Sequence, residues 1–108
     1  MGFEHMKSRE FREAVDGFTR ALEENPSFKE AYFNRGNAYI YLSQFDDAIE
    51  DFNTALRIDP EYADAWYCLG LTNILMGNRE KAKAYYEKAC KLGSERACAK
   101  LEGLRNHE

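Results

Sequence analysis

The chain has 108 residues, which is room for one domain with one modest hydrophobic core. Apolar residues make up 44% and charged residues 31%, a balance that is ordinary for a folded protein and argues against disorder. The formal net charge of −4, without any run of basic residues, argues against nucleic acid as a partner. No apolar stretch approaches the ~20 residues that cross a bilayer, which argues against membrane insertion.

In chain order, the sequence repeats itself at a shift of 34 residues. The recurring positions hold small or aromatic residues: Ala14, Ala48 and Ala82; Phe18, Phe52 and Tyr86; Ala21, Ala55 and Ala89. Residues 1–28 are predicted to form a partial unit, residues 29–62 and 63–96 two complete units, and residues 94–106 a capping helix. We expect residues 1–108 to make a single domain.

Each complete unit is predicted to form two antiparallel helices. In the first unit, Tyr32, Gly36 and Tyr39 are spaced i, i+4, i+7, so they share one helix face, and Phe52 lies at the centre of a similar stripe in the second helix. A glycine at Gly36 lets the two helices approach closely, and an aromatic ring fills the space between them. No segment has the two-residue alternation of a strand.

Short breaks in the pattern separate these helices. Residues 42–44 and 76–78 mark the turns within the units, and Pro26 and Pro60 mark the loops between units, because proline ends one helix and opens the next. In the capping helix, Ala97, Leu101 and Leu104 are expected to point inward.

The partial unit leaves one end of the predicted stack without a neighbour. Only residues 1–8 remain of its first helix, and about three repeats are normally needed for stability. We therefore hypothesise that the exposed helix around Phe11, Val15 and Phe18 pairs with a second copy of the chain, which would give a homodimer.

The residues at these spacings resemble the tetratricopeptide repeat (TPR) family over nearly the whole chain. The resemblance implies an all-α fold in which antiparallel helix-turn-helix repeats stack as a right-handed superhelix, an α-α solenoid. Three positions depart from the family pattern: Arg35 replaces the usual Leu, Asn73 the usual Tyr, and Ser94 the usual Pro.

The resemblance also implies that the first helices of successive units line a concave groove. Its predicted lining is Phe33, Asn34, Asn37, Ile40 and Tyr41 in one unit, and Tyr67, Leu71, Ile74 and Leu75 in the next. Most of these side chains lie beside the core stripe, so each first helix has an apolar face that its own core does not need. We predict a protein-interaction scaffold, an adaptor that binds a peptide or helix of a partner protein in this groove. The alternative is a structural module that self-associates, or forms part of a longer array, without a separate peptide ligand.

Some TPR proteins grip the C-terminal carboxylates of heat-shock chaperones with a clamp of Lys, Arg and Asn side chains. Asn34 matches the middle position of that clamp, but Asp64 and Cys68 occupy positions where the family places cations, and Phe3 occupies the first-repeat position. An acid and a thiol cannot replace those cations, so the sequence disfavours this clamp.

We predict no enzyme, no cofactor and no metal site. His5 and His107 lie near opposite ends of the chain without a second ligand at helical spacing. Acidic residues such as Asp46, Asp47 and Glu50 are interpreted as a solvated helix face near a helix N-terminus, where negative charge is favourable. No catalytic residues are identified.

The cysteines leave two interpretations open. Cys68, Cys90 and Cys98 lack the spacing of a zinc site. On the first interpretation, Cys90 and Cys98 form a disulfide, because they resemble the cysteine pair of secreted, disulfide-bonded relatives of the repeat family. On the second, which we favour from sequence, they are two small buried residues. The cellular location of the protein depends on the same question. We favour the cytoplasm, and a bridge between Cys90 and Cys98 would indicate an oxidising compartment.

Overall fold

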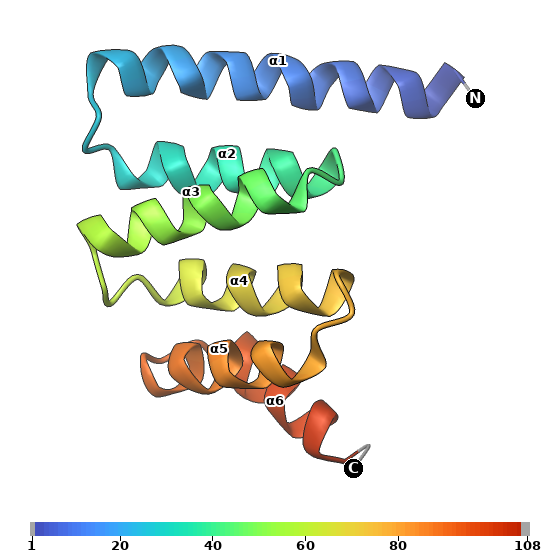
Figure 1. Ribbon diagram of the computed structural model, residues 1–108, viewed down its shortest axis with the longest axis vertical. Coiled ribbons are helices and arrows are strands. Elements are labelled where there is room, and N and C mark those ends of the chain that lie inside the picture. Colours follow the sequence, from blue (N-terminus) through green and yellow to red (C-terminus); the bar gives the residue numbers. More distant parts are fainter. Residues whose placement is uncertain (1, 107–108) are drawn as a thin grey trace.

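Six α-helices make up the part of the chain that the computed structural model describes, residues 2–106, with side chains described from residue 7. They are α1 (Gly2–Glu24), α2 (Lys29–Tyr41), α3 (Phe45–Ile58), α4 (Ala63–Leu75), α5 (Arg79–Lys91) and α6 (Glu95–Asn106). Figure 1 shows α1 to α5 stacked in chain order with alternating direction, and α6 crossing behind α5. Residues 2–106 hold no strand, so the predicted all-α repeat solenoid is confirmed.

Close contact between a glycine and an aromatic ring joins the two helices of each complete unit. A Cβ atom added to Gly36 of α2 would lie 2.7 Å from Cε1 of Phe52 in α3, and one added to Gly70 of α4 would lie 2.6 Å from Cε1 of Tyr86 in α5. Phe52 and Tyr86 are fully buried. The close approach predicted at these glycines is therefore confirmed, and any side chain there would displace a core ring.

One kind of turn joins α2 to α3, α4 to α5 and α5 to α6. Its middle residue has a positive φ: 59° at Ser43, 84° at Gly77 and 102° at Gly93. The next residue donates its backbone N–H to a carbonyl five residues earlier, as Ser94 does to Ala89 at 3.0 Å. Because the same turn connects α5 to α6 and α2 to α3, the chain reverses direction after α5 in the same way as after α2.

Two of these turns have glycine at the middle position, and the third has Ser43. The left-handed conformation is strained for a residue with a Cβ atom, so Ser43 is unfavourable at this position. We expect Ser43→Gly to raise the free energy of unfolding by about 0.5–1 kcal/mol, since the Ser43 side chain is exposed. Urea denaturation followed by circular dichroism measures this. Gly77→Ser is the reverse control and should lower stability; equal effects of the two substitutions would contradict the explanation.

An aromatic side chain near the start of α2, and another near the start of α4, forms a hydrogen bond to the preceding proline loop. The Tyr32 hydroxyl donates to the carbonyl oxygen of Pro26 at 3.0 Å, and the indole N–H of Trp66 donates to the carbonyl oxygen of Pro60 at 2.9 Å. Both bonds span six residues, so the two units share this contact as well as their core.

Helix α1 differs from the sequence-based expectation. A separate half helix over residues 1–8 was expected, whereas α1 runs without a break from Gly2 to Glu24. The residue equivalent to Ser43 and Gly77 is Arg9, which favours a helix over a left-handed turn, so the helix continues.

The expected exposed apolar face of α1 is also wrong. Phe11, Val15 and Phe18 are half-buried, and the Phe11 ring stacks on Tyr41 with centroids 4.4 Å apart. The exposed residues of α1 are mostly charged. A homodimer stays a prediction, but it does not follow from an unpartnered apolar stripe on this helix.

The unusual Arg35 forms a buried ion pair in place of a Leu contact. Its Nε and Nη2 atoms lie 2.8 and 2.6 Å from the two carboxylate oxygens of Asp51 in α3, and its Nη1 lies 3.1 Å from the Thr19 hydroxyl of α1. Asp51 is 3% exposed, and this burial raises the pKa of its carboxyl although Arg35 opposes the shift. Three helices therefore meet at one guanidinium.

The other two departures from the family pattern are also compensated. Asn73 is buried, and its side-chain amide donates to the carbonyl oxygen of Leu69 at 2.8 Å. Ser94 precedes α6, and its hydroxyl accepts a hydrogen bond from the backbone N–H of Ala97 at 3.2 Å, which caps the helix.

Candidate functional site

A groove runs between α4 and α6. On α4, Tyr67, Leu71 and Ile74 follow one another at i, i+4, i+7, and on α6 Arg96, Lys100 and Leu104 do so at i, i+4, i+8. The two stripes face each other: Arg96 lies over Tyr67 at one end, and Leu71 and Ile74 lie beside Lys100 and Leu104 at the other. We call these six residues the α4–α6 groove.

One end of the α4–α6 groove is open. It contains a hollow of about 290 Å³ lined by Leu71, Ile74, Tyr86, Ala99, Lys100, Gly103 and Leu104. This volume is close to the lower limit of ligand pockets, and most of the lining is apolar. A Cβ atom added to Gly103 would meet no atom within 4 Å, so this glycine leaves the hollow open.

The other end of the α4–α6 groove is covered by Arg96. Its guanidinium lies 4.6 Å from the centroid of the Tyr67 ring, and its Nη2 lies 3.9 Å from a carboxylate oxygen of Asp64. The side chains of Arg96 and Asp64 are 68% and 57% exposed, so water screens this ion pair and its contribution to stability is small. Arg96 can therefore turn toward another anion.

Tyr67 was predicted to line the groove, and little of its side chain is exposed. Tyr67 is 8% exposed because Arg96 covers one side and the ring packs against Tyr86, with centroids 5.7 Å apart. Tyr67 lies beneath Arg96 at the covered end of the groove, while Leu71 and Ile74 line its open end.

The predicted groove residues of α2 have different surroundings. Phe33 and Ile40 are half-buried against the core, and the Phe33 ring meets Tyr62 edge-on at 5.2 Å. Asn34 is exposed, and Asn37 is half-buried. The structure therefore does not gather these residues into one hollow with Leu71 and Ile74.

Two further predicted residues lie where their helices end. Tyr41 of α2 is 69% exposed and Leu75 of α4 is 51% exposed. Neither lines the hollow beside Leu71. They present apolar surface at the C-terminal ends of α2 and α4.

A contact between Asn37 and Cys68 joins α2 to α4. The Cys68 thiol donates to the side-chain oxygen of Asn37 at 3.5 Å, and the Asn37 amide donates to the backbone carbonyl of Phe33 at 3.3 Å. Burial raises the pKa of the Cys68 thiol to about 12. The thiol therefore stays protonated and is a poor nucleophile.

Sequence reasoning missed the contribution of α6 to the site. Arg96, Lys100, Gly103 and Leu104 were interpreted only as parts of a capping helix, with Leu104 pointing inward. The signal that could have found them is the i, i+4, i+8 spacing of Arg96, Lys100 and Leu104, which places them on one face.

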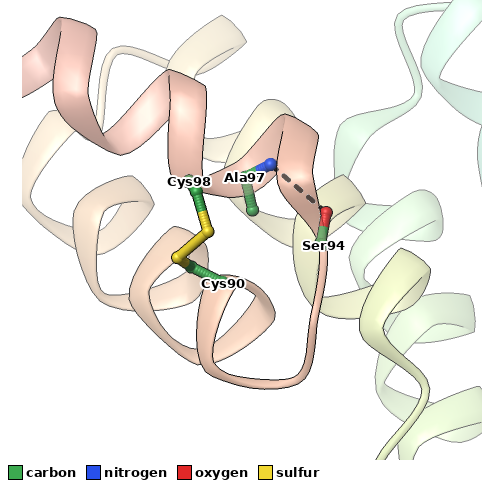
Figure 2. The surroundings of a disulfide bond; sticks show 4 residues. All are labelled: Cys90, Ser94, Ala97 and Cys98. Atoms are coloured by element: carbon green, nitrogen blue, oxygen red, sulfur yellow. Dashed lines mark hydrogen bonds between the residues drawn. A yellow bond between two sulfur atoms is a disulfide. The ribbon is translucent and has the colours of Figure 1, made fainter.

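Helix α6 is joined to α5 by a disulfide between Cys90 and Cys98 (Figure 2). Their Cα atoms are 4.8 Å apart, and the two residues are separated by eight positions. Cys90 lies in the last turn of α5 and Cys98 in the first turns of α6, while Cys68 is a free thiol. Of the two interpretations left open by the sequence, the structure contains the bridge.

Within the described side chains, no group of three or more His, Cys, Asp or Glu residues is placed to hold a metal ion. His5, His107 and Phe3 lie outside these side chains. Among the helices of residues 2–106, none has the length and apolar character needed to cross a membrane.

Three family profiles match the chain: one described as TPR repeat over residues 36–77, and two described as tetratricopeptide repeat over residues 18–50 and 63–95. The TPR domain of Sgt2 from Aspergillus fumigatus is 33% identical, with a TM-score of 0.83 over 94% of this chain and 70% of that one. The chain belongs to the TPR family.

Two further proteins are similar to this chain. The first TPR of Spaghetti (RPAP3), bound to the HSP90 peptide SRMEEVD, is 26% identical with a TM-score of 0.83, over 98% of this chain and 86% of that one. Tetratricopeptide repeat protein 6 from Homo sapiens is 53% identical over 36 residues, which are 33% of this chain. The matched segment spans 7% of the length of that human protein.

Proposed function

We propose that this chain binds a peptide or helix segment of a partner protein in the α4–α6 groove. The observation that carries the proposal is the open hollow of about 290 Å³ beside Leu71, Ile74 and Leu104. A similar TPR fold, that of Spaghetti, has been solved with a peptide bound, which supports a peptide as the class of ligand.

The groove chemistry favours a ligand with one large apolar side chain next to a carboxylate. The hollow is lined mainly by aliphatic groups, which offer contact to a side chain of the size of Leu, Met or Phe. Lys100 lies at its rim, and the guanidinium of Arg96, which lies over the Tyr67 ring, makes only a weak, exposed ion pair with Asp64. Both cations are therefore available to a carboxylate of the ligand.

The HSP90 peptide of the Spaghetti structure is not part of this proposal. At two of the positions that hold cations in the family clamp, this chain has an exposed carboxylate, Asp64, and a buried thiol, Cys68. The cations of this chain come instead from α6, so we expect its ligand to differ from a chaperone C-terminus.

Substitution of Gly103 tests the proposal without deleting any contact. Gly103→Leu is expected to fill the hollow and to weaken peptide binding at least ~10-fold, because the ligand's apolar side chain loses its site. The fold should persist, since a Cβ atom at Gly103 meets nothing within 4 Å. Peptides are first selected from a phage-displayed library on wild-type protein, and their affinities are then measured by calorimetry.

Gly17→Leu is the matched control, because Gly17 is an exposed helical glycine on α1 that also has no neighbour within 4 Å of an added Cβ atom. This variant should bind as wild type does. Equal affinity of Gly103→Leu and Gly17→Leu would refute the α4–α6 groove as the binding site.

The second candidate function is structural self-association. It is favoured by the exposed apolar side chains of Tyr41, Leu75 and Met76 at the ends of α2 and α4. On this alternative, Leu75→Glu changes the sedimentation coefficient of the wild-type oligomer, whereas Gly103→Leu leaves it unchanged. A wild-type chain that sediments as a monomer at high concentration excludes it.

A further inference from the structure

Helix α6 packs mainly on α5, at the end of the stack (Figure 1). Ala97 and Leu101 are its buried residues, and Leu104 packs against the edge of the core. Its polar contacts lie at the surface: Arg96 with Asp64 and the Tyr67 ring, and a 3.0 Å hydrogen bond from the Arg79 guanidinium to the carbonyl oxygen of Leu104. Such surface contacts contribute little to stability, so α6 is held by a small number of buried side chains and by the disulfide.

The disulfide holds the start of α6. Cys98 lies next to the buried Ala97 and is bonded to Cys90 in the last turn of α5 (Figure 2). The bond therefore fixes the first turns of α6, which also carry Arg96. Cys90 and Cys98 are both partly exposed, so a small thiol can reach the bridge.

We propose that the Cys90–Cys98 disulfide is a redox latch that holds α6 in place as one wall of the α4–α6 groove. With the bridge formed, Arg96, Lys100 and Leu104 stay opposite α4 and the groove is complete. With the bridge reduced, α6 opens and the groove loses that wall. This inference rests on the proposed function, because it concerns the control of the same binding site.

The reductant is a dithiol. One of its thiolates attacks a sulfur of the bridge and forms a mixed disulfide, which its second thiol resolves. The S–S bond of the protein is broken and the S–S bond of the oxidised dithiol is formed. Cys90 and Cys98 each gain one electron and one proton, so two electrons and two protons move from the dithiol to the protein.

Thiol counting is the first test. The protein as purified without reductant, unfolded in guanidinium chloride, should show one thiol with Ellman's reagent, that of Cys68, and three after treatment with dithiothreitol. Three thiols before treatment would mean that the bridge does not form, and would overturn the proposal.

Hydrogen exchange measured by mass spectrometry is the second test. On reduction with dithiothreitol, the amides of α6 are expected to exchange roughly 10- to 100-fold faster, as removal of the loop constraint predicts. The amides of α2 and α3 should keep their rates. The Cys90→Ser/Cys98→Ser variant should exchange as reduced protein does and should not respond to dithiothreitol. Unchanged α6 rates, or an equal increase in every helix, would each overturn the latch.

Peptide binding is the third test, with the peptide selected on the oxidised protein as the probe. Reduction should weaken its binding at least ~10-fold, since half of the groove lining comes from α6. Equal affinity in both states, with faster exchange in α6, would overturn the control of binding. If no peptide is selected at all, the proposed function fails and the control of binding fails with it, while the exchange rates still decide whether the bridge holds α6.

Discussion

Phe52→Ala is expected to lower the free energy of unfolding by about 3–5 kcal/mol, as is usual for the loss of a fully buried aromatic ring. The Phe52 side chain is 0% exposed and lies between α2 and α3. Urea denaturation followed by circular dichroism measures the change. A loss of less than about 1 kcal/mol would contradict the role of this ring as the main contact between the two helices.

The contact between Gly36 and Phe52 allows a sharper test by a double-mutant cycle. In the wild-type background, Gly36→Ala should lower stability by about 1–3 kcal/mol, because its Cβ atom would lie 2.7 Å from the Phe52 ring. In the Phe52→Ala background the ring is gone, and Gly36→Ala should raise stability by up to ~1 kcal/mol through helix propensity. The same sign in both backgrounds would refute the direct contact.

The second large effect is expected at the buried ion pair. Asp51→Ala should lower the free energy of unfolding by about 3 kcal/mol, because it leaves the Arg35 guanidinium without its partner. The value is at the low end of the usual range since the Arg35 side chain is 18% exposed and retains some access to water. Urea denaturation again measures the change.

The second repeat unit supplies the control for this prediction. The residues equivalent to Arg35 and Asp51 are Leu69 and Tyr85, so Arg35→Leu/Asp51→Tyr copies the apolar residue pair that the second unit holds at these positions. We expect this double variant to be as stable as wild type or more stable, since well-packed apolar groups often replace a buried ion pair without loss. A double variant less stable than Asp51→Ala would show that the pair is not exchangeable for apolar packing.

The helix pairs could be predicted from the sequence because their packing is local. Gly36 and Phe52 meet within one unit, and Gly70 and Tyr86 repeat the contact in the next. A repeated sequence therefore specifies repeated geometry, and the 34-residue shift was enough to find it.

The position of α6 could not be predicted in the same way. The shift aligns Ser94 with Pro60, which suggests a loop between units, whereas Gly93 forms the same turn as Gly77. The choice between these turns depends on φ at one glycine and on the contacts that α6 makes afterwards. Arg96 and Lys100 therefore entered the site only when the structure placed α6 beside α4.

Burial of Tyr67 has a similar cause. The spacing predicted a place for Tyr67 beside the core stripe of α4, whereas Tyr67 belongs to the buried core and is covered by Arg96, which lies 29 positions later in the chain. Periodicity shows which face of a helix a residue occupies, and does not show what a distant helix places over it.

Trp66, whose indole N–H binds the carbonyl oxygen of Pro60, also provides an intrinsic fluorescence signal. Trp66 is the only tryptophan of the chain, and its indole lies near Tyr85 and the ammonium of Lys88, both in α5. Its emission therefore reports the environment of one repeat unit, whereas circular dichroism averages over every helix. A denaturation curve recorded both ways would reveal whether the units melt together or one after the other.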